Sequence, residues 1–340
     1  MKTCKLLLAA LLAAGTLLPA NAATWRLNPN PDAGADFTSI DEAMADDRVK
    51  EGDELLLDPG TYSGDNKLTK NRLTLTGPGH FLAQDGWSNI DRVIFDKITP
   101  SEGSTIQGCC VKGNLIAADS SKILRCRLND IRCNKNISNL TINGNYILFI
   151  TYGNLSSFKY QHCDISNNII IGYIYNIDNS TIKNNTFLGH YKDSVLTDGC
   201  PLYSITNSTI VDNILMNQYI GAGNISKLVH QCSYVTVVNN VLSVTAANMN
   251  TAYPDNYYVG ATLENTFIDN ITGDRYLLRD DSVAKGKATD GGECGAFGGS
   301  HPYVLSGIPT NMPSITEAKI PTTPTDGKLA ITLKIAIQND

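Results

Sequence analysis

Side chains that could exchange protons with a substrate gather near the middle of this 340-residue chain. The catalytic candidates are Lys159, Lys183, His190, Lys192 and Asp193. A lysine or histidine could remove a proton as a general base, and a nearby carboxyl group could return one as a general acid. The chain holds five histidines and 27 lysines plus arginines, so a scatter of this kind also arises by chance. The sequence therefore leaves catalysis uncertain and favours a protein without an identifiable catalytic site.

Aromatic side chains form a second group of candidates, for binding a ligand. The substrate-binding candidates are Trp87, Tyr191, Tyr203, Tyr219 and Tyr257. The flat, apolar face of an aromatic ring suits the C–H face of a sugar ring. Four of the five lie in the long segments 186–206, 216–232 and 243–262, and insertions in a repeat protein often share one face and form its binding surface. For Trp87, the simpler interpretation is a loop anchor packed on the protein body.

The cysteines do not indicate a metal site. Residues Cys109 and Cys110 are adjacent, and Cys126 and Cys133 lack a nearby histidine, so no pair has zinc spacing. No calcium-binding cluster of aspartates is visible either. We therefore expect no metal and no cofactor, and Ca²⁺ becomes possible only if the protein is a lyase. Because free cysteine often serves as a small buried hydrophobe, we expect mostly buried thiols and one or two disulfides.

A repeated phrase predicts the framework that would position these candidates. Residues 179–187 read Asn-Ser-Thr-Ile-Lys-Asn-Asn-Thr-Phe, and residues 207–215 read Asn-Ser-Thr-Ile-Val-Asp-Asn-Ile-Leu. Weaker copies surround them. The asparagines that anchor the copies are Asn145, Asn168, Asn185, Asn213 and Asn240, with steps of 23, 17, 28 and 27 residues. Repeats of this length are single coils of a solenoid, since each must stack on its neighbours to bury its apolar face.

The alternation inside each copy selects the kind of solenoid. The apolar residues recur with a period of two, which is typical of strands, and the signature of leucine-rich repeats is missing. The sequence therefore predicts a parallel β-solenoid. Asparagine tolerates left-handed backbone conformations and bonds nearby backbone groups, so we expect the anchor asparagines to form the corners of the coils. Side chains at the same corner of successive coils could also form a ladder, a structural role without chemistry.

The first 22 residues have the features of a secretory signal peptide. A short basic stretch precedes an apolar run from Leu6 to Leu18, and Ala20-Asn21-Ala22 is a small-x-small cleavage site. We expect cleavage near Ala22 and export to the periplasm, the cell surface or the exterior. No other segment is long and apolar enough to span a membrane. The net charge of −6 and the lack of a basic patch argue against nucleic acid as a partner.

Motifs at both ends of the repeats resemble a known superfamily. The segment Asp36–Met44 has the pattern of a short capped helix, and Gly52–Tyr62 that of a turn, a buried strand and a Pro-Gly turn. Near the end, residues 286–303 contain Gly-Ala-Phe-Gly-Gly. Together they resemble secreted right-handed parallel β-helix proteins of the pectin-lyase-like superfamily, especially those of Bacteroides-like bacteria. The resemblance implies an all-β, single-stranded right-handed parallel β-helix over 23–312, with an N-terminal capping helix and a tight terminal coil at 286–303.

The resemblance also implies what an activity would be. Enzymes with this fold usually cleave acidic polysaccharides, either by β-elimination at a uronate or by hydrolysis between two carboxyl groups. The hydrolase motifs are not found here. The segment most similar to the Gly-His-Gly motif, Gly189-His190-Tyr191, lacks the second glycine, and Asp280-Asp281 lies beyond the repeats. An active site, if present, is therefore divergent.

Residues 313–340 contain two runs in which apolar and polar residues alternate, and this pattern predicts a β-hairpin tail. This tail either covers the C-terminal end of the solenoid or adds a strand to a protein partner. Three functions remain open. The first is a secreted protein that binds polysaccharide or a cell-surface glycan. The second is a polysaccharide lyase or glycosidase acting on acidic glycans, and the third is a structural adhesin or stalk.

Overall fold

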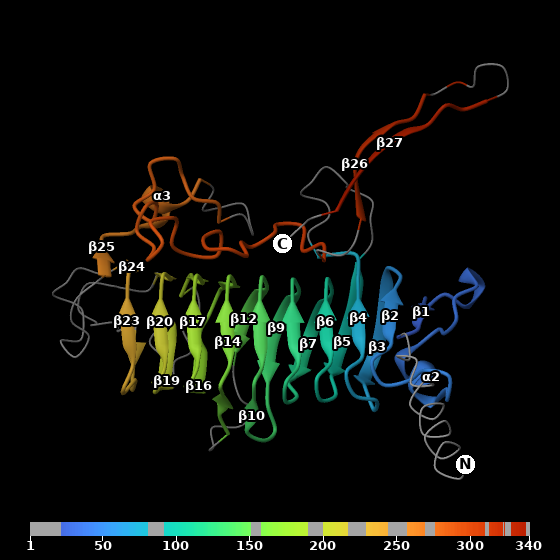
Figure 1. Cartoon of the computed structure of the whole chain (residues 1–340), viewed down its shortest axis with the longest axis horizontal. Helices are drawn as coiled ribbons and strands as arrows, with labels where there is room; N and C mark the ends of the chain where they lie inside the picture. Colours follow the sequence, from blue (N-terminus) through green and yellow to red (C-terminus); the bar gives the residue numbers. More distant parts are fainter. Residues whose placement is uncertain are drawn as a thin grey trace, which may run out of the picture.

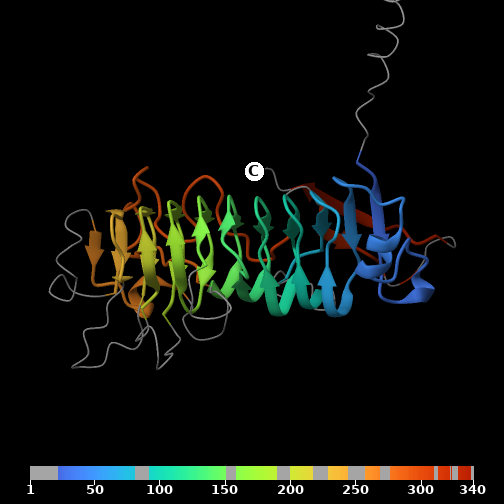
Figure 2. The ribbon, with the colours of Figure 1, turned by 90° about the horizontal axis from the view of Figure 1, so that it is seen from below.

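The computed structural model describes residues 22–80, 92–150, 158–189, 200–216, 229–243, 257–268, 276–309, 313–321, 323 and 328–337. The predicted signal peptide lies outside these residues, apart from Ala22. Within them, two long parallel sheets face each other, and the coils follow one another in sequence order along the longest axis (Figure 1 and Figure 2). This arrangement confirms an all-β parallel solenoid.

One sheet has ten strands in the described part of the chain. Its strands, in order, are β1 (Thr24–Leu27), β2 (Glu54–Leu57), β4 (Thr74–Thr76), β6 (Thr105–Gln107), β8 (Lys122–Leu124), β11 (Thr141–Asn143), β14 (Asp164–Ser166), β17 (Thr181–Lys183), β20 (Thr209–Val211) and β23 (Thr236–Val238). From β4 on, each is a three-residue strand. Its middle side chain points inward, and the first and third point out, because side chains alternate along a strand. The middle residues from Leu75 to Ile210 are fully buried.

The other sheet has fifteen strands among the described residues. Ten form its main path: β3 (Gly60–Lys67), β5 (Val93–Thr99), β7 (Cys110–Ile116), β9 (Arg127–Arg132), β12 (Tyr146–Ile150), β15 (Ile169–Ile170), β18 (Thr186–Phe187), β21 (Ile214–Leu215), β24 (Asn240–Leu242) and β25 (Tyr257–Val259). Five pair beside it: β10 (Ile137–Ser138), β13 (Tyr160–Gln161), β16 (Ile174–Asp178), β19 (Leu202–Thr206) and β22 (Val229–His230). A continuous apolar core fills the space between the sheets.

The corner between the two sheets uses two consecutive residues, and the sequence prediction of their roles was partly wrong. The left-handed residue is the one before each anchor, such as Asn167, Asn184 or Asp212, with φ of 54°, 52° and 57°. The anchor itself points inward. Asparagine, aspartate and glycine tolerate the left-handed region best, which explains why polar residues come in pairs at this corner.

The anchors form a buried ladder along the axis. The backbone N–H of Asn168 donates to Oδ1 of Asn185 at 3.0 Å, and the N–H of Asn185 donates to Oδ1 of Asn213 at 2.8 Å. The same bond joins Asn145 to Asn168 at 2.9 Å and Asn213 to Asn240 at 2.9 Å. All five side chains are fully buried. The ladder thus satisfies backbone groups that the corner removes from the strand pairing.

Cysteines take the anchor position in the earlier coils. The thiol of Cys109 donates to the carbonyl of Gln107 at 3.1 Å, and that of Cys126 to the carbonyl of Leu124 at 3.2 Å. All eight cysteines in the described part of the chain are free thiols, seven of them buried. The expected one or two disulfides are therefore not formed among the described residues, and five of the eight thiols fill separate places in the apolar cores.

Short helices and a separate strand pair lie outside the two sheets. They are the 3-10 helix η1 (Pro31–Ala33), helix α2 (Ile40–Ala45) and helix α3 (Leu263–Thr266). Ser39 caps the start of helix α2, since its hydroxyl accepts a hydrogen bond from the N–H of Glu42 at 3.1 Å. Strands β26 (Pro313–Lys319) and β27 (Thr332–Ile337) pair antiparallel and project away from the solenoid (Figure 1).

Residues 284–309, here called the return segment, do not form the terminal coil that the sequence predicts. They run back along the corner of the solenoid toward its N-terminal end (Figure 1). The thiol of Cys294 donates to Asn239, and the N–H of Ala296 donates to Oγ1 of Thr186. Further on, Arg125 donates to the carbonyl of Ile308. This course follows because the segment's polar groups bond to corner residues instead of extending a sheet.

Candidate functional site

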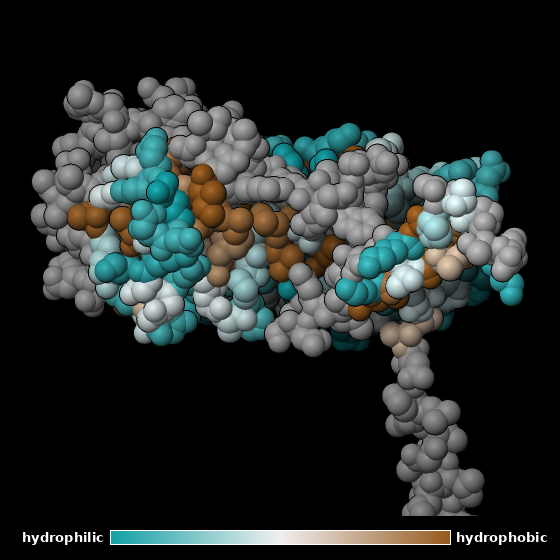
Figure 3. Space-filling view, turned by 90° about the horizontal axis from the view of Figure 1, so that it is seen from above, coloured by the Kyte–Doolittle hydropathy of each residue, from teal (hydrophilic) through white to brown (hydrophobic). Residues whose placement is uncertain are grey.

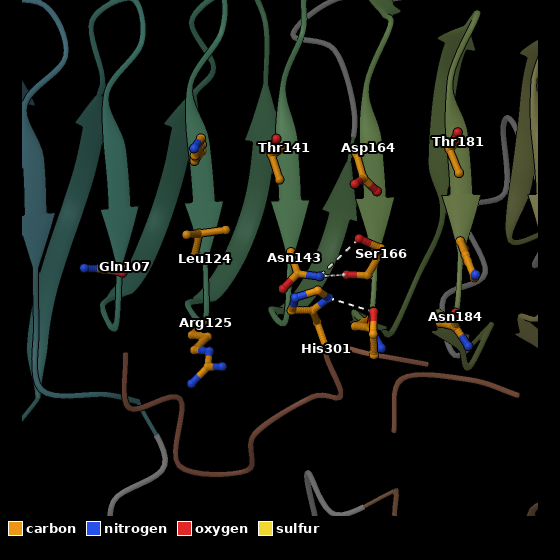
Figure 4. A pocket seen from close by; sticks show the side chains of 14 residues that line it. Gln107, Leu124, Arg125, Thr141, Asn143, Asp164, Ser166, Thr181, Asn184 and His301 are labelled. Carbon is orange, nitrogen blue, oxygen red and sulfur yellow. Dashed lines mark hydrogen bonds between the residues drawn. The ribbon is translucent and has the colours of Figure 1, made fainter. Parts of the chain in front are cut away.

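A polar groove of about 560 Å³ lies on the outer face of the ten-stranded sheet, beside the return segment (Figure 4). It spans the outward side chains of β6, β8, β11, β14 and β17, and the corner residues that follow them. The lining residues used below are Lys122, Arg125, Asn143, Asp164, Ser166, Lys183 and His301. We call this site the polar groove.

Strand register explains how the polar groove is built. The first residues of the strands pair across coils, so Thr141 lies between Lys122 and Asp164. The third residues pair likewise, so Ser166 lies between Asn143 and Lys183. Because neighbouring strands are about 4.8 Å apart, each row presents polar groups at that repeat along the solenoid axis. Figure 4 shows these two rows side by side.

The polar groove combines hydrogen-bonding groups with an excess of positive charge. Lys122, Arg125 and Lys183 line it, with Asp164 as its carboxylate among the described residues. The ammonium of Lys183 lies 3.9 Å from Oδ2 of Asp212, which is almost fully buried. The amide of Asn143 donates to the hydroxyl of Ser166 at 3.1 Å. Such a surface suits a ligand with many hydroxyl groups, and it favours one that also carries negative charge.

The return segment forms one wall of the polar groove. His301 lies over the groove (Figure 4), and its ring Nδ1 is 2.9 Å from the hydroxyl of Ser300. The buried carboxylate of Asp212 accepts hydrogen bonds from the N–H of Thr289 at 2.8 Å and from its hydroxyl at 2.7 Å. Asp212 belongs to the next coil beyond the floor. The amide of Asn167, which lines the groove, also donates to the carbonyls of Ala296 at 3.0 Å and Gly298 at 2.7 Å, so the wall is held to a corner of the floor as well.

The structure separates the catalytic candidates that it describes. Lys183 lines the polar groove. Lys159 lies at the fifteen-stranded sheet, where its ammonium is 3.7 Å from Oδ2 of Asp178. His190, Lys192 and Asp193 lie outside the described residues. In the described part of the chain, no three His, Cys, Asp or Glu residues are grouped so as to hold a metal ion.

Of the aromatic candidates, Tyr203 is the one whose side chain is described. It is 7% exposed and stacks on Tyr175, with ring centroids 4.8 Å apart. Little of the ring is therefore open to a ligand. Tyr257 begins strand β25, but its side chain lies outside the description, as do Trp87, Tyr191 and Tyr219 altogether.

Sequence reasoning missed Lys122, Arg125, Asp164 and His301. The strand pattern could have indicated Lys122 and Asp164. Both occupy the first, outward position of a three-residue strand, which is threonine in the coils of Thr141 and Thr181. Arg125 takes the left-handed corner position, with φ of 51°. No local pattern could have found His301, because the course of the return segment brings it to the groove.

The carboxylate of Asp178, near Lys159, accepts several hydrogen bonds between neighbouring coils. Burial opposes its ionisation, but hydrogen bonds from Thr206, Asn207 and Gln161 and the charge of Lys159 lower its pKa to about 2. The hydroxyl of Thr206 and the amide of Asn207 donate to Oδ1 at 2.7 and 2.9 Å. A charged acceptor of this kind joins the end of strand β16 to the end of strand β19 in the next coil.

Replacing Asp178 with asparagine is expected to lower the free energy of unfolding by about 1 to 3 kcal/mol, because several donors lose the charge of a buried carboxylate that accepts their hydrogen bonds. Urea denaturation followed by circular dichroism would measure this. The matched control is Asp65→Asn, which breaks an exposed ion pair with Lys97 and should cost less than about 1 kcal/mol. Equal losses in the two variants would contradict a structural role for Asp178.

Comparison of the chain with protein-family models, with curated proteins and with solved structures finds no match. The geometry of the groove and the fold are therefore the basis for a functional proposal. Within the described ranges, no helix has the length and apolar character needed to cross a membrane.

Proposed function

We propose that this chain is an exported protein that binds carbohydrate along the polar groove. The observation that carries the proposal is the alignment of amide, hydroxyl and cationic groups in register over successive coils. An extended polymer lying along the solenoid axis would meet a new set of these groups at each coil, about every 4.8 Å. A polysaccharide supplies hydroxyl groups at a comparable repeat, so many weak contacts would add along one chain.

Charge favours an acidic polysaccharide over a neutral one. The three cations Lys122, Arg125 and Lys183 outnumber the carboxylates of Asp164 in the groove and Asp212 beside Lys183, although the whole chain has a net charge of −6. Carboxylate or sulfate groups on the glycan would accept charge-assisted hydrogen bonds from these side chains. Binding should accordingly weaken as the salt concentration rises.

The finer features of the fold belong to the same proposal. We infer a right-handed, pectin-lyase-like β-helix, in which α2 covers the N-terminal end of the solenoid. Its side chains Ile40, Ala43 and Met44 are buried, as a cover requires. The strand pair β26–β27, formed within 313–340, would then be free to add a strand to a protein partner at the cell surface.

The test is binding of a panel of acidic and neutral polysaccharides to the full chain, measured by affinity electrophoresis. Lys183→Gln is expected to weaken binding of the best acidic glycan about fivefold, since it removes one charge-assisted contact. Lys97→Gln is the matched control, because Lys97 pairs with Asp65 on the other sheet and its side chain is about as accessible as that of Lys183. If both variants weakened glycan binding equally, the polar groove would not be the binding site.

The same samples test catalysis. Absorbance of the unsaturated uronate product, with and without Ca²⁺, would rise if the groove performed β-elimination. A rise that disappears in Lys183→Gln would make the protein a lyase, with Lys183 as its candidate base. Absence of both binding and product formation would leave the structural adhesin or stalk as the better explanation.

A further inference from the structure

A second groove, of about 400 Å³, lies on the outer face of the fifteen-stranded sheet. Its position follows from strand register. Ile94, Cys110, Arg127 and Tyr146 occupy the same outward position in β5, β7, β9 and β12, so they lie in one row across four coils. This groove is on the sheet opposite the one that carries the polar groove, and it is lined by none of the same residues.

The floor of the second groove is apolar. In later coils the same outward row continues with Ile169, Ile214 and Val241, which are buried under the return segment in a second core. Tyr146 and Ile171 lie half-buried at the margin of that core and line the groove together with Leu148. The groove is thus the part of one outward row, apolar except at Arg127 and Thr186, that the return segment leaves open. The face that carries this segment shows a strip of apolar surface between hydrophilic patches (Figure 3).

The rim of the second groove is cationic. Arg92, Lys112 and Arg127 line it, with no carboxylate among the described lining residues. The guanidinium of Arg127 lies 5.1 Å from the centre of the Tyr146 ring, which fixes that charge beside the floor. Burial raises the pKa of the Cys110 thiol, and all three cations oppose this rise, so their charges act on one point of the floor.

We propose that the second groove binds a small amphipathic anion, an aromatic or alicyclic carboxylate or sulfonate. Its ring would lie on Tyr146, Leu148 and Ile171, and its acid group would face Arg92, Lys112 and Arg127. Charge complementarity carries this choice, because a neutral apolar ligand would leave the cationic rim unused and a simple ion would leave the floor exposed. The volume is within the range of small-molecule sites.

The test uses three probes and isothermal titration calorimetry with the full chain. 2-Naphthoate has both ring and charge, 2-naphthamide has the ring alone, and acetate has the charge alone. The wild-type protein should bind 2-naphthoate at least about tenfold more tightly than either of the others, since only 2-naphthoate uses floor and rim together. Equal affinity for 2-naphthamide, equal affinity for acetate, or no binding of 2-naphthoate would overturn the proposal.

Variants locate the binding site. Arg92 and Lys112 are both exposed, so Arg92→Gln combined with Lys112→Gln should leave the fold intact, which a thermal melt checks. This double variant should weaken binding of 2-naphthoate at least about fivefold. Lys122→Gln removes a charge from the polar groove and should not change the affinity. Unchanged binding in the double variant, or an equal loss in Lys122→Gln, would place the probe elsewhere and refute the assignment.

Discussion

Replacing Asn185 with alanine is expected to lower the free energy of unfolding by about 3 kcal/mol. Oδ1 of Asn185 accepts from the N–H of Asn168 at 3.0 Å, and its Nδ2 donates to the carbonyl of Ile165 at 2.8 Å. Both partners are buried within the solenoid, where water cannot replace the lost side chain. Each buried group left without a partner costs about 1 to 3 kcal/mol, so two such losses add to the value expected.

Two further variants give this prediction its controls. Asn143→Ala makes the same chemical change on the half-buried floor of the polar groove, where its loss should stay below about 1 kcal/mol. Asn185→Cys should fall between the two, because Cys109 and Cys126 show that a thiol at this position still donates to a carbonyl, whereas sulfur is a weaker acceptor than an amide oxygen. Urea denaturation with a common slope would rank the three. If Asn185→Ala and Asn143→Ala were equally stable, the buried ladder would contribute no more to the free energy of unfolding than a surface asparagine does.

Acidification from pH 7 to pH 5 is expected to destabilise the protein by about 2 kcal/mol through one buried histidine. His80 is fully buried, with Nδ1 2.9 Å from the carbonyl of Arg125 and Nε2 3.1 Å from the hydroxyl of Tyr303. A carbonyl only accepts, so Nδ1 carries the proton and the neutral ring accepts from Tyr303. Burial, together with the charges of Arg127 and Arg92, lowers the pKa of His80 to about 3.

The direction of the effect follows from this lowered pKa. An unfolded histidine has a pKa of about 6.5, so below that pH the unfolded chain binds a proton that the folded chain excludes. The stability contributed by neutral His80 is therefore complete above pH 6.5 and is lost as the pH falls toward 3. Across that whole window the loss reaches about 4 to 5 kcal/mol.

The variant His80→Gln isolates this contribution, since glutamine has no titrating group. We expect it to be less stable than the wild type at pH 7 and to lose about 2 kcal/mol less between pH 7 and pH 5. Free energies of unfolding at a series of pH values would measure both curves. Parallel curves for the two proteins would show that His80 is not the group that titrates.

The repeating part of the fold was predictable because its signal is local. The alternation around Ile165, Ile182 and Ile210 specifies a strand with one buried face, and the steps between anchors specify coils. The assignment of the left-handed residue failed because adjacent polar residues such as Asn184 and Asn185 are equivalent in a pattern. Only the pairing between coils decides which one turns and which one points inward.

The site was much less predictable than the fold. Lys183 could be placed on an outward position from its strand, but Lys122 and Asp164 replace threonine in their rows and look like ordinary surface substitutions. The wall of the groove depends on contacts between residues far apart in sequence, such as Thr289 with Asp212. No periodic pattern in the sequence predicts such a contact. The return segment needs only scattered polar groups and tight turns to bond to the corners between the two sheets.

The return segment also changes how this solenoid would come apart. A stack in which each repeat touches only its neighbours can fray from either end, one coil at a time. Here the backbone N–H of His80 donates to the carbonyl of Ser306, and the thiol of Cys294 donates to the carbonyl of Asn239. The return segment therefore contacts both early and late coils. Fraying at the C-terminal end must therefore also release part of the return segment, which raises cooperativity. The return segment can reach His80 only after residue 306 has been synthesised, so this contact forms after the coils that it joins.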